Sequence, residues 1–215
     1  YIMLLPFLPI FFSIVKPEII TLAPENHVSI TGPINAYSQS KFINDIENIH
    51  SKYIYIYISS AGGNVIHGEN IIQYMQYKKA QNKRLLCIAD KAYSMAFHIF
   101  QHCTHRYILP SSSIMQHQMH LTFEGELSKV QNYINYIDKI NTRFINLESK
   151  RLKILPKEYK SKITNEWWLY GKEIITSHTA DMMLDAVGCH QSLFKENKHM
   201  SIDDNVVIVS KCPLI

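Results

Sequence analysis

The chain has 215 residues and a mass of 25.0 kDa, so we expect a single domain with a sizeable hydrophobic core. Hydrophobic residues make up 47% of the chain, which is close to the average for globular proteins. A net charge of +4 and a pI of about 8.7 are too mildly basic to indicate a protein that binds nucleic acid.

The first twelve residues are strongly apolar. They contain two prolines and are too few to cross a membrane as a helix, so we expect no membrane association. One interpretation of residues 1–26 is an N-terminal segment that remains from a targeting sequence.

Strand-like and helix-like segments alternate from residue 27 onward. Strands are predicted over residues 27–31, 53–58 and 84–89, with helices over residues 38–49 and from residue 69, and a further short strand ends at His117. This alternation predicts an α/β domain built from right-handed βαβ units. No repeat or low-complexity linker divides the chain, so residues 27–215 are expected to form one domain.

A long helix is predicted from Glu126 to about Lys153, because apolar residues recur there in steps of three to five without an interrupting glycine or proline. At 1.5 Å per residue it would be about 40 Å long, which exceeds the diameter of a domain of this size, so part of it should protrude. Two shorter helices are predicted over 156–163 and 172–183, a loop over 193–204 and a last strand over 206–209.

Glycine is scarce, with seven in the chain, about half of the usual share of roughly 7%. Three of them, Gly62, Gly63 and Gly68, lie in one short stretch after the strand over 53–58. Such residues are used where the backbone turns sharply or approaches another group. Two interpretations fit: an ordinary turn between strand and helix, or a cradle of backbone N–H groups for a carbonyl oxygen.

A serine and a histidine follow two successive strands. Ser94 lies at the start of an apolar helix, where it is either an N-cap or a nucleophile that benefits from nearby N–H groups and the positive end of the helix dipole. His117 lies at the end of the next strand. A serine and a histidine at neighbouring strand ends are the arrangement that a serine hydrolase needs.

Short motifs in a specific order carry a family resemblance. They are Thr31-Gly32, Ile58-Ser59-Ser60-Ala61-Gly62-Gly63, Ala92-Tyr93-Ser94-Met95, Leu109-Pro110 and Met115-Gln116-His117-Gln118. In this order the sequence resembles the ClpP family, the proteolytic core of the Clp machinery, over about residues 27–190.

The resemblance implies the ClpP/crotonase-like fold with a handle over about residues 120–155. It also assigns site residues. Ser94 takes the nucleophile position and His117 that of the general base, while the backbone N–H groups of Gly63 and Met95 take the oxyanion positions. Ungapped alignment from His117 places Glu166 at the position of the family's third catalytic residue, an aspartate.

Several positions depart from the family pattern. The acid is Glu166, one methylene longer than aspartate, and it is followed by the bulky Trp167. In the family, a glycine-rich segment forms the edge against which the substrate peptide pairs; the corresponding residues 120–124 contain no glycine. Asn165 stands where the family has an arginine that links the two stacked rings. These changes resemble the ClpR class of non-catalytic or weakly catalytic paralogues.

We therefore expect a ClpR-type subunit of the Clp proteolytic core, which contributes to ring assembly and to docking of the ATPase. The alternative is an active serine endopeptidase with a Ser94–His117–Glu166 triad, and a lesser one is a crotonase-type acyl-CoA enzyme. The resemblance implies a heptameric ring, formed alone or with a catalytic ClpP paralogue, and a Clp-type AAA+ chaperone. No phosphate-loop motif is present in the sequence, so ATP-driven unfolding would come from that partner, and residues 1–26 would belong to the axial region.

Cysteines and histidines suggest no cofactor. Cys87, Cys103, Cys189 and Cys212 show no close pairing, so reduced thiols in a reducing compartment are expected. His98, His102, Cys103 and His105 are close enough in sequence for a metal site, but we favour solvated loop histidines and expect neither a metal nor another cofactor.

The composition bears on localisation. Asn, Lys, Ile and Tyr are abundant while Gly and Ala are sparse, which is typical of an AT-rich genome. Together with the ClpR features, this favours the stroma of a plastid, including a relict plastid (apicoplast) as in malaria parasites.

Overall fold

The computed structural model describes residues 18–195, 197–202 and 205–214. Of the side chains of 197–202 and 205–209, nothing is described. The apolar residues 1–12 singled out above lie outside the described part of the chain.

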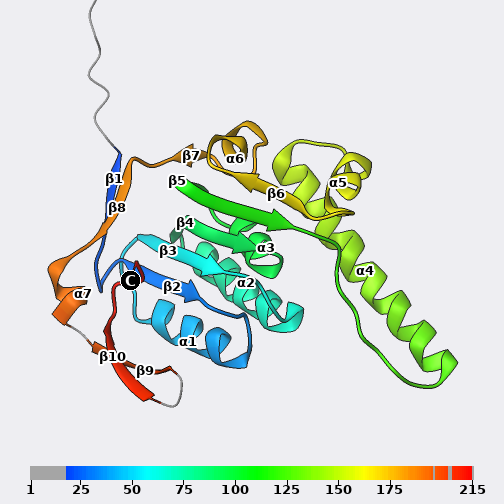
Figure 1. Cartoon of the computed structure of the whole chain (residues 1–215), viewed down its shortest axis with the longest axis horizontal. Coiled ribbons are helices and arrows are strands. Elements are labelled where there is room, and N and C mark those ends of the chain that lie inside the picture. The colour runs from blue at the N-terminus through cyan, green and yellow to red at the C-terminus, as the bar shows by residue number, and fades with distance from the viewer. Residues whose placement is uncertain (1–17, 196, 203–204, 215) are drawn as a thin grey trace, which may run out of the picture.

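A six-stranded sheet forms the centre of the molecule (Figure 1). Its parallel strands are β2 (His27–Thr31), β3 (Tyr53–Ser60), β4 (Arg84–Tyr93) and β5 (His105–Gln116), in that spatial order. Strand β6 (Trp167–Tyr170) pairs antiparallel with the end of β5, and β7 (Met182–Met183) pairs parallel with its start. The strand order brings the carboxyl ends of β3, β4 and β5 to one edge, where the motif residues lie.

Helices follow the parallel strands, as the alternating pattern predicts. They are α1 (Ala36–Glu47), α2 (Val65–Ala80) and α3 (Met95–Gln101). Neighbouring helices contact one another in chain order, and α3 contacts the long helix α4 (Leu127–Leu152). The main core lies between these helices and the sheet, and its largest fully buried side chains include Phe42, Phe97, Phe100 and Tyr159.

Helix α4 projects well beyond the sheet (Figure 1). Its C-terminal half is anchored by the buried Phe144, Ile145 and Leu152, whereas Leu127 at its first turn is 85% exposed. With 26 residues at 1.5 Å each, it is about 39 Å long, so the predicted protruding helix is confirmed. None of the helices in the described ranges is both long and apolar enough to cross a membrane.

The chain after α4 departs from prediction at two places. Helix α5 (Pro156–Ile163) begins with proline at its first position, as expected. Helix α6 (Lys172–Thr176) ends seven residues before the predicted residue 183, because His178 adopts a left-handed conformation with φ of 60° and the chain turns into β7. The prediction of a loop over 193–204 was also wrong, because this range contains the end of one helix and a strand, described next.

A smaller layer lies beside the main sheet. Strand β1 (Ile19–Leu22) pairs parallel with β8 (Ala186–Cys189), followed by helix α7 (Gln191–Lys195) and the hairpin of β9 (Asn197–Ile202) and β10 (Asn205–Ser210). Pairing with β10 holds the polar segment 197–202 in a strand, which the local composition did not indicate.

The four cysteines form two disulfides, so the expectation of reduced thiols was wrong. Cys87 is bonded to Cys103 and Cys189 to Cys212, with a Cα–Cα distance of 5.9 Å in both pairs. Strand β4 lies against the turn after α3, and β8 lies against the C-terminal segment. The bonded cysteines are 16 and 23 residues apart in sequence. They meet only because distant segments lie side by side in the fold, so no local sequence pattern indicates the pairing.

Two of the three histidines expected to be solvated, those in and directly after α3, are buried. His98 is 1% exposed, His102 is 7% exposed, and only His105 of the three lies at the surface. Because α3 is enclosed by α2, α4 and the sheet, its polar side chains need internal partners. Among the described residues no group of three or more potential ligands is arranged to hold a metal ion.

His98 belongs to a buried charge cluster that joins three helices. Its Nδ1 lies 2.8 Å from Oε1 of Glu148 on α4, and its Nε2 lies 3.5 Å from Oε1 of Glu69 on α2. Arg143 pairs with the other Glu69 oxygen at 2.9 Å. Burial by itself lowers the pKa of His98, but the Glu148 and Glu69 carboxylates outweigh it and raise that pKa above its ordinary value.

The raised pKa of His98 makes stability depend on pH. The charged imidazole stabilises the folded chain fully below the ordinary pKa of 6.5, and this contribution is lost as the pH rises through the folded-state pKa. We expect the free energy of unfolding, measured in urea at a series of pH values, to fall as the pH is raised from 6.5 through the folded-state pKa of His98. The variant His98→Gln keeps a donor for Glu148 but cannot be protonated, so its dependence should be flatter. An equally steep fall in the variant would contradict this assignment.

Candidate active site

The two adjacent glycines allow the turn after β3 to approach Ser94. A Cβ added to Gly62 would lie 2.6 Å from the Tyr93 carbonyl oxygen and 2.8 Å from the Cβ of Ser94. A Cβ on Gly63 would lie 2.4 Å from the Ile34 carbonyl oxygen. Both approaches are too close for any side chain, and both glycines have positive φ, 92° and 148°. The turn therefore lies against the start of α3.

Ser94 stands in a strained conformation between β4 and α3. Its φ of 53° is unusual for a residue with a side chain, and conformations of this kind cost about 1–3 kcal/mol and cluster at functional sites. Ser94 is the N-cap residue of α3 by position, but its side chain makes no capping hydrogen bond, so the hydroxyl is free for another partner. Its backbone N–H donates to the Met115 carbonyl at 2.9 Å, which fixes Ser94 beside the end of β5.

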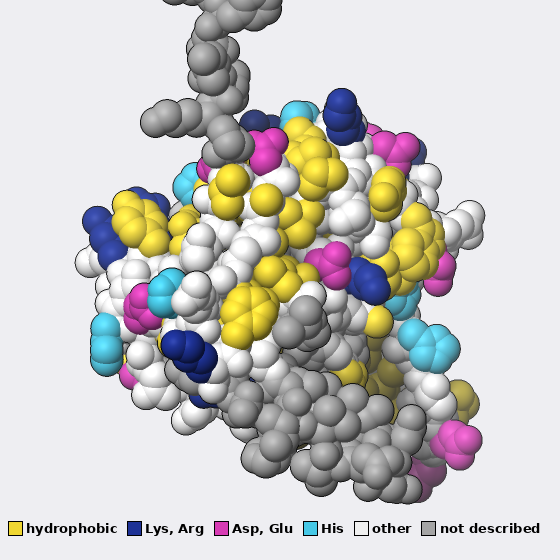
Figure 2. Space-filling model, turned by 60° about the vertical axis from the view of Figure 1, so that its left-hand side comes forward, with side chains coloured by type: hydrophobic (Ala, Val, Ile, Leu, Met, Phe, Trp, Pro, Cys, Tyr) yellow, Lys and Arg dark blue, Asp and Glu magenta, His cyan; other side chains and the backbone are white. Residues whose placement is uncertain are grey.

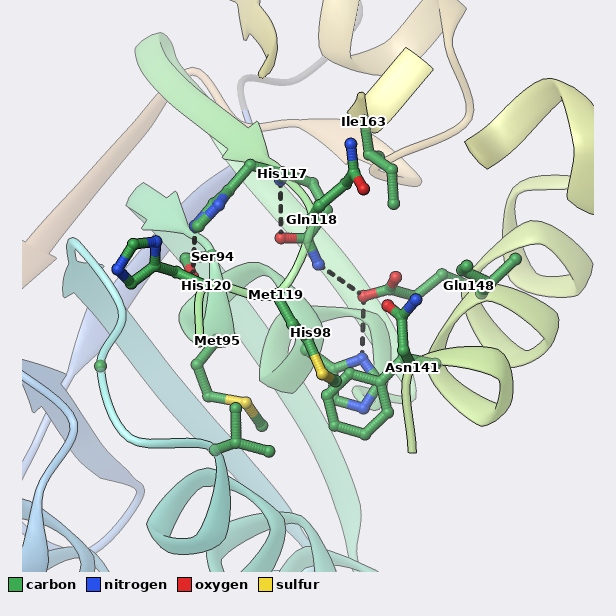
Figure 3. Close-up of a pocket in the computed structure, with 15 residues that line it drawn as sticks. Ser94, Met95, His98, His117, Gln118, Met119, His120, Asn141, Glu148 and Ile163 are labelled. Atoms are coloured by element: carbon green, nitrogen blue, oxygen red, sulfur yellow. Dashed lines mark hydrogen bonds and ion pairs between the residues drawn. The ribbon is translucent and has the colours of Figure 1, made fainter. Parts of the chain in front are cut away.

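The hydroxyl of Ser94 meets the imidazole of His117. Ser94 Oγ lies 2.8 Å from His117 Nε2, and the two side chains point toward each other (Figure 3). This is the contact through which a histidine takes a proton from a serine nucleophile. The register of β4 and β5 brings the two residues together, since Tyr93 is opposite Met115.

The two predicted oxyanion residues line the same pocket as this pair. Gly63 and Met95 both border it beside Ser94 and His117. The hydrogen bonds that join the Gly63 turn to Ile34 are made by the residues on either side, Gly62 and Asn64, so the Gly63 N–H is not used in this bridge. Met95 is the first residue of α3, and the first N–H groups of a helix have no partner within it.

Glu166 does not complete a triad. Its carboxylate accepts a hydrogen bond at 3.0 Å from Nε1 of Trp168, two residues along the chain. No hydrogen bond among the described residues joins Glu166 to His117. Glu166 has a positive φ of 60°, and Trp168 is 53% exposed with its ring edge against Tyr93 at a centroid distance of 5.0 Å. The structure thus brings together Ser94 and His117 but leaves the predicted acid apart.

The pocket beside the pair has a cavity volume of about 120 Å³. Its apolar lining comes from Met95, Met119, Phe144 and Ile163, together with one side chain each of α2 and α4. Besides Ser94 and His117, its polar lining includes Gln116, His98, Asn141 and Glu148, and the last three lie across the cavity from Ser94 (Figure 3).

The segment after His117 forms no strand. Residues 117–126 contain no helix or strand, and 120–124 are exposed. Extended peptide binding against a sheet edge uses main-chain hydrogen bonds of a regular strand. Residues 120–124 offer no such strand in this structure.

Sequence reasoning missed two groups of this site. Trp168 gave no signal, because its effect depends on the turn that brings its indole to Glu166. For Glu148 the sequence does contain a signal, which is its spacing from apolar residues of the same helix. It lies four residues after Phe144 and four before Leu152, on the face of α4 that is buried.

The sequence matches the Clp protease family over residues 16–185, which is most of the chain. The matched range contains the glycine turn, the Ser94–His117 pair and the protruding helix. The α/β architecture described above is that of the ClpP fold. On this match, the chain belongs to the Clp protease family.

Proposed function

We propose that this chain is a ClpR-type subunit of a Clp proteolytic core, with a site of its own that is weakly catalytic or non-catalytic. Family membership supports a place in the core. The observation that carries the rest is the position of the acid. Glu166 is hydrogen-bonded to Trp168, and Ser94 is the only partner of the His117 ring among the described residues.

The chemistry available to Ser94 and His117 is that of a serine peptidase without its third member. Ser94 Oγ attacks the scissile carbonyl, His117 Nε2 takes its proton, and the N–H groups of Gly63 and Met95 bind the oxyanion. His117 then gives the proton to the leaving amine. A carboxylate on Nδ1 normally fixes the tautomer and stabilises the imidazolium, and its loss lowers kcat by about 10⁴ in serine peptidases.

A second candidate is an active peptidase with a Ser94–His117–Glu166 triad. The 2.8 Å contact between Ser94 Oγ and His117 Nε2 favours it, because that contact is already suited to proton transfer. This candidate requires Glu166 to leave Trp168 and turn toward His117. The crotonase-type alternative is less favoured, since an acyl-CoA enzyme has no need of the serine–histidine contact.

Ring assembly is proposed from the surfaces that a single chain leaves exposed. Helix α4 presents Leu127, Ile134 and Tyr136 to solvent. On the opposite side, Ile19, Met182 and Phe194 are exposed, and apolar side chains are visible over the part of the surface that Figure 2 brings forward. Exposed apolar surfaces of this kind favour protein partners. We propose neighbouring subunits, a catalytic ClpP paralogue and a Clp-type ATPase, in the stroma of a plastid or apicoplast.

Labelling with a fluorophosphonate probe measures whether Ser94 is activated. We expect the assembled protein to react slowly and the variant Ser94→Ala not to react, because the histidine contact is present and the acid contact is not. An active ClpP serves as positive control. Labelling as fast as that control would overturn the proposal in favour of the active peptidase.

Replacing Trp168 tests whether its indole withholds the acid. We expect Trp168→Phe to raise the labelling rate of Ser94, because phenylalanine keeps an aromatic ring near Tyr93 but has no N–H for Glu166. One net hydrogen bond of about 1 kcal/mol predicts a gain of roughly fivefold. The control Glu166→Gln in the Trp168→Phe background should remove the gain. An unchanged rate in Trp168→Phe would mean that Trp168 is not the restraint.

Sedimentation tests the assembly. We expect a species of seven chains, or a multiple of seven, formed alone or after mixing with a catalytic paralogue. Replacing Leu127 and Ile134 by serine should reduce stacking of rings if the exposed stripe of α4 is a contact. A chain that stays monomeric at micromolar concentration, alone and with the paralogue, would exclude a ring subunit.

A further inference from the structure

The position of His117 is connected to α4 through the side chain of Gln116. Gln116 is the last residue of β5 and is 6% exposed. Its Oε1 accepts a hydrogen bond from the backbone N–H of His117 at 3.1 Å, and its Nε2 donates to Oε1 of Glu148 at 2.9 Å. Both ends of the amide are therefore used, and Gln116 joins His117 to Glu148.

Glu148 is itself held from two other elements. His98 on α3 approaches its Oε1 at 2.8 Å, and the Tyr159 hydroxyl on α5 donates to its Oε2 at 2.6 Å. Glu148 is 1% exposed and Tyr159 is fully buried. A buried carboxylate with three donors is a rigid group, because each donor that turned away would leave a polar atom without a partner.

The carboxylate also decides which way the Gln116 amide faces. A carboxylate accepts hydrogen bonds and does not donate them, so only the NH₂ end of Gln116 can face Glu148. The carbonyl end must then face the backbone N–H of His117. With Glu148 in place, the amide has one orientation, and that orientation holds the main chain of His117.

We propose that Gln116, anchored by Glu148, is a positioning residue for His117 and takes over part of the role that an acid on the imidazole normally has. The inference rests on the proposed function, in which Glu166 does not hold the ring. The imidazole is fixed at Nε2 by Ser94, and its main chain is fixed by Gln116. About 1 Å of misplacement at a reacting group can lower a rate by roughly 10²-fold.

The plain alternative is that these hydrogen bonds only stabilise the core. Both roles predict a loss of stability when a bond is removed, so stability does not distinguish them. The matched control is Tyr159→Phe, which removes one bond to the same carboxylate and neither of the two hydrogen bonds described for Gln116, although the Tyr159 hydroxyl also lies near the Gln116 amide. The test variant is Gln116→Met, which has a similar shape and makes neither bond.

Two readouts separate the roles. The first is the ¹⁵N spectrum of the histidine rings in the assembled protein, in which His117 is assigned with the variant His117→Gln. We expect the His117 signal to shift or broaden in Gln116→Met and to stay unchanged in Tyr159→Phe. The second is the fluorophosphonate labelling rate of Ser94, with an expected loss of about 10- to 100-fold in Gln116→Met and no matching loss in Tyr159→Phe.

A charge swap provides a rescue. In the double variant Gln116→Glu with Glu148→Gln, the carboxylate at 116 accepts from both the His117 N–H and the amide at 148, at a pH at which His98 is neutral and its Nδ1 accepts from the same amide. We expect the swap to restore the His117 signal relative to Gln116→Glu alone, which places two carboxylates side by side. If Gln116→Met does not assemble, the swap carries the test.

The outcomes are distinct. A His117 signal that is the same in Gln116→Met and Tyr159→Phe would overturn the inference, as would an assembled swap in which His117 is displaced. An unlabelled wild-type chain would show instead that the site is non-catalytic. The nitrogen spectrum would still decide whether Gln116 positions His117, because it does not depend on turnover.

Discussion

The close approach of the glycine turn to Ser94 is the constraint on which the site depends. At Gly62 and Gly63 a Cβ would collide with Ser94 and Ile34. The close approach places Gly63 at the border of the cavity, where its N–H could hold an oxyanion. The parallel register of β4 and β5 then places His117 opposite. Ser94, His117 and the Gly63 turn thus come from three consecutive strand ends of one sheet, and the sheet topology itself brings these positions together.

Around this frame, polar groups are divided between two environments. His98, Glu148 and Tyr159 are enclosed, each hydrogen-bonded and sequestered from water. Glu166 and Trp168 are at the surface, where a hydrogen bond competes with solvent. Glu166, which the resemblance aligns with the family's acid, is therefore in the weaker environment, whereas Glu148 on the long helix is in the stronger one and is hydrogen-bonded to Gln116.

Much of the fold follows from the sequence, because apolar periodicity and glycine placement are local signals. They predicted the α/β alternation, the long helix to within a residue at each end, and the pairing of Ser94 with His117. Contacts between distant segments were not predictable in this way. The disulfide of Cys87 with Cys103, the burial of His98 and the turn of Glu166 toward Trp168 each depend on which elements lie side by side. Glu148 is the intermediate case, since its place in an apolar stripe was visible but had no meaning without its partners.

The exposed contact between Glu166 and Trp168 also has a statistical consequence. A surface hydrogen bond with a net value of about 1 kcal/mol favours its closed form by roughly five to one, so about one molecule in six would have the carboxylate released at any moment. In a ring of seven such chains, about one released carboxylate would then be present on average. For a subunit of the proposed type, weak activity would then depend on how often the Glu166 carboxylate is released from Trp168, and would not be a fixed property of the chain.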